Sequence, residues 1–246
     1  MATAKIEERT ALILSRIPQK EHDAMVRAID EEGLFSFYAR GAFKMGGTTN
    51  YATQELAYSA LNLHVSGSGA ITLKEGRIKR LYAPKGGLEG LLVAQLILEF
   101  ASKALPEEDA GAFFPTLESA LLALEESADP YSLAIMFLAK GMIASGFGLE
   151  VGHCVNCGAT KDIVAIDFVH GGFLCEECLP MASRGPSDLE ELKIYRHAFR
   201  CPSSDFQRVN YPPLAKTRVL NDLLIYLSDA AGVKLHSLDS VLHLHA

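Results

Sequence analysis

The sequence lacks several features that would assign it to a familiar functional class. It contains no stretch of about 18 uncharged apolar residues, so we expect no membrane-spanning helix. Its first ten residues, Met1 to Thr10, are charged and lack the apolar segment of a signal peptide. The motifs G-x-x-x-x-G-K-[ST], G-x-S-x-G and H-E-x-x-H are all absent. We therefore predict a cytoplasmic protein that is not an enzyme and has no small-molecule substrate.

Cysteine is scarce, and four of the 5 cysteines form two pairs. The pairs Cys154–Cys157 and Cys175–Cys178 give the pattern C-x2-C-x17-C-x2-C, which is typical of a structural zinc site with four thiolate ligands. Disulfides are disfavoured because no secretory context is visible, and a thioredoxin-like dithiol needs only one C-x-x-C. The spacing predicts one structural Zn2+ ion with no open position for a substrate.

The residues around the two pairs agree with a zinc ribbon. Glycines flank both pairs and permit unusual backbone angles in the turns. Ile163 to Val169 is mostly β-branched and apolar, which predicts a hairpin strand within an insertion over residues 150–182. His153 adjoins the first pair, and we expect it to play no direct ligand role. Cys201 precedes a proline and is predicted to be a lone buried or inert thiol. His243 and His245 are predicted to be solvated tail residues.

Charge is distributed unevenly along the chain. The net charge is −7, but residues 1–85 carry 12 Lys and Arg against 9 Asp and Glu, whereas residues 86–246 carry 11 against 21. A mildly basic front part can face phosphates, and the acidic rear part cannot.

The front part is rich in short apolar runs separated by polar or glycine-containing turns. These runs predict five strands in residues 1–82, and an OB-fold is the usual five-stranded closed barrel. Helix in part of 52–65 is an alternative, and residues 46–50 are expected to form a flexible loop. The predicted strands cover Ala11–Ile17, Ala24–Ile29, Leu34–Ala39, Tyr58–Val65 and Ala70–Leu73.

After residue 86 the apolar period changes to that of helices. Asp129 followed by Pro130 predicts an N-cap with a proline in the first turn, and Ser187 to Glu190 has the spacing of a capping box. The fold class is therefore α+β: an N-terminal five-stranded OB-fold barrel, residues 1–82, followed by a helical domain, residues 83–246, into which the zinc ribbon is inserted.

The candidate DNA-binding residues are cations of the predicted barrel. Lysine and arginine neutralise phosphates and release counterions, which gives salt-sensitive affinity without sequence preference. Aromatic side chains near them can stack on bases, although alternating aromatics such as Phe35 and Phe37 are more often core residues. The candidates are Arg16, Lys20, Arg27, Arg40, Lys44, Arg77, Lys79 and Arg80.

Three local motifs and their order resemble the bacterial recombination mediator family RecO across essentially the whole chain. Residues 39–44, Ala-Arg-Gly-Ala-Phe-Lys, resemble the basic stretch of this family after its third strand. Residues 146–149, Gly-Phe-Gly-Leu, lead into the first cysteine pair as in the family, and residues 171–174, Gly-Gly-Phe-Leu, lead into the second. The chain departs from the family at residues 45–48, which are uncharged, and at residues 67–69, where a family arginine is missing.

The resemblance implies a mediator of DNA repair and recombination in the bacterial cytoplasm, associated with the nucleoid. Its expected partners are single- and double-stranded DNA, RecR, the single-stranded-DNA-binding protein and, indirectly, RecA. It implies annealing of complementary strands and help in loading RecA onto coated strands. The departures from the family at residues 45–48 and 67–69 predict weaker binding to DNA and an unchanged fold.

Two other functions stay open at this point. A metal-dependent nucleic-acid hydrolase would need clustered carboxylates, and the dense acidic runs are Glu107–Asp109 and Asp188 with Glu190–Glu191. Both look like charges at helix starts, where the helix dipole favours them. A purely protein-binding adaptor with a structural zinc would show no salt-dependent binding to DNA.

Overall fold

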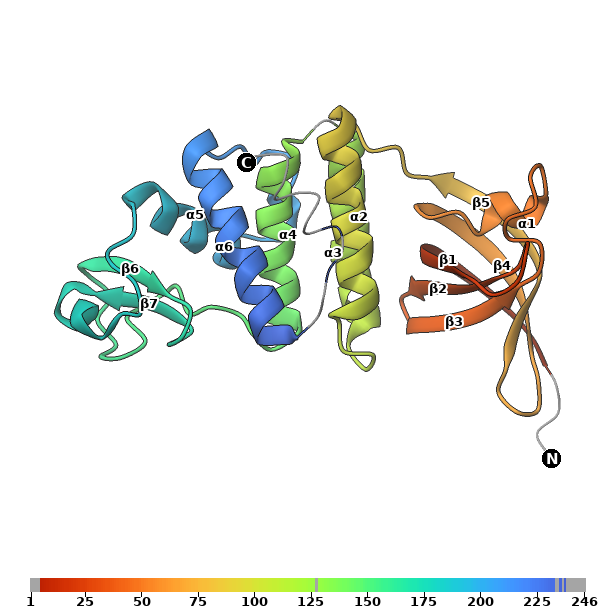
Figure 1. Ribbon diagram of the computed structural model, residues 1–246, viewed down its shortest axis with the longest axis horizontal. Coiled ribbons are helices and arrows are strands. Elements are labelled where there is room, and N and C mark those ends of the chain that lie inside the picture. Colours follow the sequence, from red (N-terminus) through yellow and green to blue (C-terminus); the bar gives the residue numbers. More distant parts are fainter. Residues whose placement is uncertain (1–4, 127, 233–234, 236, 238–246) are drawn as a thin grey trace. The chain divides into compact units, whose positions relative to one another are not determined.

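A computed structural model describes residues 5–126, 128–232, 235 and 237 (Figure 1). His243 and His245 lie outside the described residues. The described chain forms two compact units. Unit 1 contains the residues up to Ala83 together with Leu98–Pro115, and unit 2 contains Pro84–Ile97 and the residues from Thr116 onward. The functional division into 1–82 and 83–246 stays a prediction.

Unit 1 is built on the predicted five-stranded closed barrel, with strand order β1-β2-β3-β5-β4. Most neighbouring strands are antiparallel, and β3 meets β5 in parallel at Tyr38 and Thr72. A short helix, α1, connects β3 to β4. The elements are β1 (Lys5–Pro18), β2 (Ala24–Asp30), β3 (Gly33–Ala39), α1 (Thr48–Ala52), β4 (Ala57–Val65) and β5 (Ile71–Leu81).

The long strand β1 closes the barrel because it pairs with two strands. Its first part, Lys5 to Leu12, pairs with β4, and its second part, from Leu12 to Pro18, pairs with β2. A register shift between Ile13 and Ser15 marks a bulge, which bends the strand between its partners.

Period-two alternation places the apolar side chains of β2, β3 and β4 inside the barrel. Phe35 and Phe37 belong to this core, with 8% and 0% of their surfaces exposed. They are core residues and are not available to stack on bases. The strand prediction for residues 57–65 is confirmed over the helical alternative, whereas the loop expected at 46–50 already contains the start of α1.

Residues 98–115 pack against the barrel within unit 1. Arg27 Nη2 lies 3.2 Å from Glu107 Oε1, and the rings of Tyr58 and Phe114 stack at 6.1 Å. Gly111 permits this packing because a Cβ atom there would lie 2.3 Å from the carbonyl oxygen of Glu31. This packing accounts for the grouping of these helical residues with the barrel.

Helices dominate the remaining chain. They are α2 (Gly87–Lys103), α3 (Ala110–Glu125), α4 (Pro130–Ala144), α5 (Leu189–Arg200) and α6 (Pro213–Ala231). Helix α4 is apolar on all sides and is buried between α5 and α6. As predicted, Asp129 caps it: the Asp129 side chain accepts a hydrogen bond from Ser132 N, and Pro130 fills the first turn.

Helix α5 begins one residue later than the capping-box pattern predicts. Asp188 is its N-cap and accepts a hydrogen bond from Glu190 N at 2.9 Å. The Ser187 hydroxyl instead accepts a hydrogen bond from Ile166 N in β6. The Ser187 side chain therefore bonds to the hairpin instead of capping the helix, as the local sequence had predicted it would.

The insertion between α4 and α5 forms the predicted hairpin. Strand β6 (Ile163–Asp167) pairs antiparallel with β7 (Gly172–Cys175), and a 3-10 helix, η1 (Glu176–Met181), follows at once. A second 3-10 helix, η2 (Ser203–Asp205), follows α5. Among the described residues, none of the helices is long and apolar enough to cross a membrane.

Candidate metal centre and nucleic-acid interface

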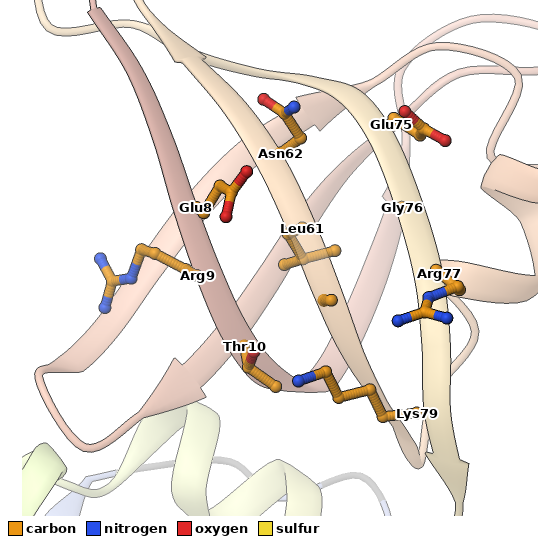
Figure 2. Close-up of a pocket in the computed structure, with 10 residues that line it drawn as sticks. Glu8, Arg9, Thr10, Leu61, Asn62, Glu75, Gly76, Arg77 and Lys79 are labelled. Carbon is orange, nitrogen blue, oxygen red and sulfur yellow. The ribbon is translucent and has the colours of Figure 1, made fainter.

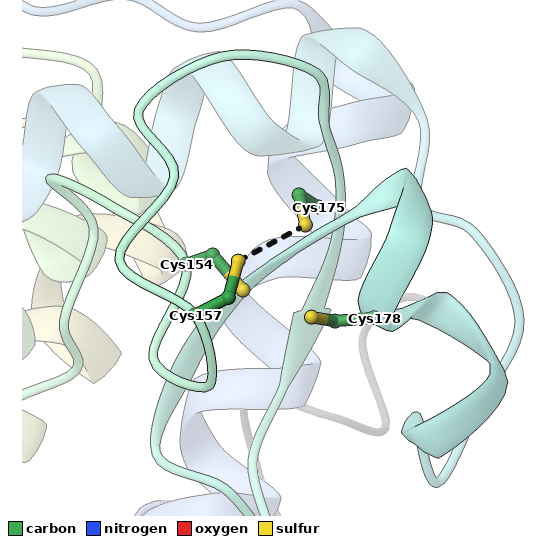
Figure 3. Close-up of side chains that lie close together, drawn as sticks. All are labelled: Cys154, Cys157, Cys175 and Cys178. Atoms are coloured by element: carbon green, nitrogen blue, oxygen red, sulfur yellow. Dashed lines mark hydrogen bonds between the residues drawn. The ribbon is translucent and has the colours of Figure 1, made fainter.

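The hairpin brings the four paired cysteines together (Figure 3). Cys154 and Cys157 lie in the turn before β6, Cys175 ends β7, and Cys178 lies in η1. The four Sγ atoms all lie within 4.8 Å of one another. Tetrahedral Zn–S bonds of about 2.3 Å require sulfur separations of about 3.8 Å. The cluster is therefore compatible with zinc.

No disulfide forms among these cysteines. The Sγ atoms of Cys157 and Cys175 are 3.5 Å apart, whereas a disulfide bond is about 2.05 Å long. Cys154, Cys175 and Cys178 are buried and Cys157 is exposed, so one edge of the cluster faces solvent. Asn156 Nδ2 donates to Cys178 Sγ at 3.2 Å, and this hydrogen bond acts to lower the pKa of Cys178, but burial and the neighbouring cysteines outweigh it and raise the pKa.

The local electrostatics favour a bound cation. Burial acts to raise the pKa of Cys154, but the backbone amides of Cys157, Cys175 and Asn156 lower it to about 6. The Ala159 amide lowers the pKa of Cys157, but the other three cysteine side chains raise it to about 12. The cluster therefore stabilises one thiolate by itself and resists further ionisation until a positive charge is present.

A buried carboxylate holds the rest of the insertion in place. Asp167 at the end of β6 has no exposed surface, and it accepts hydrogen bonds from Ser183 N, Ser183 Oγ and His170 N at 2.5, 2.7 and 2.9 Å. Burial acts to raise the pKa of Asp167, but these hydrogen bonds outweigh it and hold the pKa well below its usual range. Asp167 therefore fixes the loop that follows η1 to the hairpin.

His153 does not join the cysteines. Its Nδ1 atom lies 3.3 Å from Glu150 Oε1, and about half of its side chain is exposed. His153 thus contacts a carboxylate and lies outside the group of four cysteines.

The barrel of unit 1 carries a surface groove between β1, β4 and β5, which we call the β1–β5 groove (Figure 2). Arg77 and Lys79 supply its cationic side chains. Arg9 also borders it, but in Figure 2 the Arg9 side chain points away from them. In Figure 2 the side chains of Arg77 and Lys79 extend from β5 toward β4, and Lys79 reaches toward Thr10 on β1. The groove is lined by Glu8, Arg9, Thr10, Ala60, Leu61, Asn62, Glu75, Gly76, Arg77 and Lys79.

Gly76 shapes the floor of this groove. A Cβ atom at this position would lie 2.8 Å from the Cβ atom of Ala52 in α1. Only glycine lets β5 pass this close to α1.

Arg9 borders the groove and was not among the predicted residues, but its guanidinium is turned toward the barrel side of β1. Its guanidinium forms two hydrogen bonds to Asp30, at 2.7 and 2.5 Å, and stacks 3.8 Å from the centroid of the Phe35 ring. The hydrogen bonds and charge of Asp30 outweigh burial and raise the pKa of Arg9. The position of Arg9 beside the groove depends on the register of β1 against β4, and the local sequence around Arg9 does not reveal this register.

A second group of predicted cations lies around the loop after β3. Arg16 donates to Ala42 O at 3.1 Å and stacks on Phe43, so it holds the loop that carries Arg40 and Lys44. Asp23 accepts hydrogen bonds from Tyr38 Oη and Gly41 N. The positive charges of Lys20 and Arg40 also stabilise its carboxylate. These contacts hold the pKa of Asp23 below its usual value.

Two predicted cations stand apart from both groups. Arg27 pairs with Glu107, and its Nε atom is buried without a hydrogen-bond partner. Arg80 packs its guanidinium 5.1 Å from the Tyr82 ring centroid. Neither residue lines the β1–β5 groove.

The fold and the cysteine cluster together define a class: an OB-type barrel protein with a helical unit and an inserted four-cysteine module. Comparison with known proteins identifies a family within this class. A family model described as "Recombination protein O C terminal" matches residues 86–239, more than half of the chain. The chain therefore belongs to the RecO family.

Curated relatives cover most of the chain as well. A protein from Syntrophomonas wolfei named "DNA repair protein RecO" is 26% identical over 179 residues, covering 70% of each chain. One of the same name from Shouchella clausii is 24% identical over 235 residues, covering 94% of this chain and 91% of its own. A third, from Frankia casuarinae, is 25% identical over 175 residues, covering 69% and 72%.

Proposed function

We propose that this protein is a non-enzymatic mediator of DNA repair and recombination that binds single- and double-stranded DNA through its barrel. The supporting observation is the β1–β5 groove, where Arg77 and Lys79 project from one strand across a closed OB-type barrel. Cations spaced along such a groove can track a phosphate backbone. The family membership and the names of the relatives point to the same process.

The loop group is the second contact zone in this proposal. Arg40 and Lys44 are exposed and lie on the loop that Arg16 holds. Tyr51 in α1 is 53% exposed and offers a ring for base stacking. Glu8 and Glu75 also line the β1–β5 groove. Their charges oppose those of Arg77 and Lys79, so we expect moderate affinity and reversible contacts, as a mediator requires.

The proposed mechanism is an exchange of weak contacts. The barrel holds phosphates, while the acidic helical unit recruits the single-stranded-DNA-binding protein and RecR. Complementary strands are thereby brought together and annealed, and RecA gains access to strands that were coated. This process makes and breaks no covalent bond, so it needs no nucleophile. We place it in the bacterial cytoplasm, at the nucleoid.

In this proposal the four-cysteine cluster binds one structural Zn2+ ion. Cys154, Cys157, Cys175 and Cys178 would hold it, and the ion would supply folding free energy to the insertion rather than chemistry. With four sulfurs at the ion, no position is left for a substrate.

The hydrolase alternative is less well supported, because structural contacts engage Glu107 of the first acidic run and all three acidic residues of the second. Glu107 pairs with Arg27, and Asp188 caps α5. Glu190 pairs with Lys193, and Glu191 pairs with Arg218. Within the described part of the chain, neither run forms a group of three potential metal ligands.

The test is annealing of complementary strands that are pre-coated with single-stranded-DNA-binding protein. We expect Arg77→Ala/Lys79→Ala and Arg40→Ala/Lys44→Ala to slow annealing while circular dichroism stays unchanged. Lys74→Ala is the control, because Lys74 is exposed on β5 but does not line the groove. Unchanged annealing in both double variants would refute the assignment of the DNA site.

A further inference from the structure

A second set of metal-ligand residues lies in unit 2, at the end of α5. His197 and Cys201 are four residues apart, so the helix places both on one face. The helix ends at Arg200, and η2 then carries Asp205 back toward them. A ring nitrogen of His197, the Sγ atom of Cys201 and a carboxylate oxygen of Asp205 all lie within 4.8 Å of one another.

The imidazole of His197 is held in place. The hydroxyl of Tyr211 lies 2.7 Å from His197 Nδ1, and the two rings meet edge to face at 5.6 Å. Tyr211 is itself fixed, because its backbone N donates to the buried Ser132 hydroxyl at 2.9 Å. A partner at one ring nitrogen orients a histidine so that the other nitrogen can bind an ion.

The three residues are half-buried and border a pocket. The pocket is lined by His197, Asp205, Arg208, Val209, Asn210 and Tyr211. Solvent therefore reaches two of the three ligand residues. One nitrogen, one sulfur and one oxygen with room for water match the three-ligand zinc sites that keep an open position.

A neighbouring lysine does not account for the cluster. Burial lowers the pKa of Lys140, and the charges of Cys201 and Asp205 act in the opposite direction, so Lys140 lies near both. Its ammonium donates to Phe199 O at 3.2 Å. Among the described residues, no ion pair within 4 Å joins Lys140 to Asp205, and the Asp205 carboxylate accepts only a long hydrogen bond of 3.5 Å from Ser204 Oγ.

We propose that His197, Cys201 and Asp205 bind one divalent transition-metal ion of the Zn2+ type, separate from the four-cysteine cluster, with water from the pocket completing its coordination. Imidazole and thiolate ligands favour Zn2+, Co2+ and similar ions over Mg2+ and Ca2+. Cys201 is then a ligand, and the expectation that it is an inert thiol would be wrong.

The experiment measures bound metal in the full chain. The protein is stripped of metal, dialysed against Zn2+ and analysed by mass spectrometry of the metal content. We expect Cys201→Ala and Asp205→Ala each to lose about one equivalent of zinc relative to the wild type. The readout is the difference between proteins, so it does not depend on whether the four-cysteine cluster is loaded or on DNA binding.

Two further variants separate ligation from damage to the fold. Gln207→Ala, an exposed neighbour, should keep the wild-type zinc content. Tyr211→Phe removes only the hydroxyl that orients His197 and should weaken zinc binding by about 10- to 100-fold at the second site. Titration with Co2+ should show a thiolate charge-transfer band that is weaker in Cys201→Ala by the contribution of one cobalt–thiolate bond. Equal zinc content and equal cobalt spectra in the wild type and Cys201→Ala would overturn the proposal.

Discussion

Two lysines of one strand allow a sharp test of the DNA-binding groove. Lys74 and Lys79 both lie exposed on β5, but only Lys79 lines the β1–β5 groove. Lys79→Ala and Lys74→Ala therefore change the net charge of the protein equally. If nonlocal charge governs DNA affinity, the two variants behave alike, and if phosphate contacts in the groove govern it, only Lys79→Ala loses affinity.

The magnitude follows from counterion release. Each phosphate contact to single-stranded DNA contributes about 0.7 to the slope of log affinity against log salt concentration. Loss of the Lys79 contact should lower the slope by about 0.7, and loss of both Arg77 and Lys79 by about 1.4. Over a fourfold rise in salt, the affinity deficit of the double variant should shrink by about sevenfold.

The assay is fluorescence anisotropy with a labelled oligothymidine at several KCl concentrations. Lys74→Ala should keep the wild-type slope. Parallel lines for the wild type, Lys79→Ala and Arg77→Ala/Lys79→Ala would show that the groove makes no phosphate contacts, and the reasoning would be refuted.

Three other predictions concern stability. Cys154→Ser should lose the zinc equivalent of the four-cysteine cluster and expose residues 150–182 to limited proteolysis while the barrel stays intact; an unchanged zinc content and an unchanged melting profile would contradict this. Asp167→Asn should destabilise unit 2 by about 3 kcal/mol in urea titrations near neutral pH. Because the pKa of Asp167 is lowered on folding, this deficit is fully present above the unfolded pKa of about 4 and shrinks as the pH falls below it; a deficit that does not change with pH would contradict the assignment. Gly76→Ala should cost about 1–3 kcal/mol, because its Cβ atom would meet Ala52 at 2.8 Å, and an unchanged thermal midpoint would argue against this contact.

The helices and strands of the fold could largely be predicted from the local sequence. Alternation in β2, β3 and β4 is visible because one face of each strand is buried in the barrel. The cap of α4 at Asp129 was also predictable, because capping depends on a few adjacent residues. The capping box at Ser187 failed because a tertiary hydrogen bond to β6 takes that side chain.

Of the candidate sites, too, one could be predicted from local sequence and another only in part. The four-cysteine cluster could be predicted because zinc ribbons keep their ligands at short, fixed spacings. The groove could be predicted only in part. Arg77 and Lys79 lie close together in sequence, but Thr10 and Ala60 meet at the groove only through the pairing of β1 with β4.

By itself, the sequence determined the order of barrel, helices and insertion, the zinc-type cysteine spacing and the resemblance to RecO, because these depend on local periodicity and short motifs. Only the tertiary structure decided which cations share a surface, which of them are engaged by carboxylates, and that Cys201 meets His197 and Asp205. The physical reason is that strand register and chain reversal bring together residues far apart in sequence, and no local pattern records that juxtaposition.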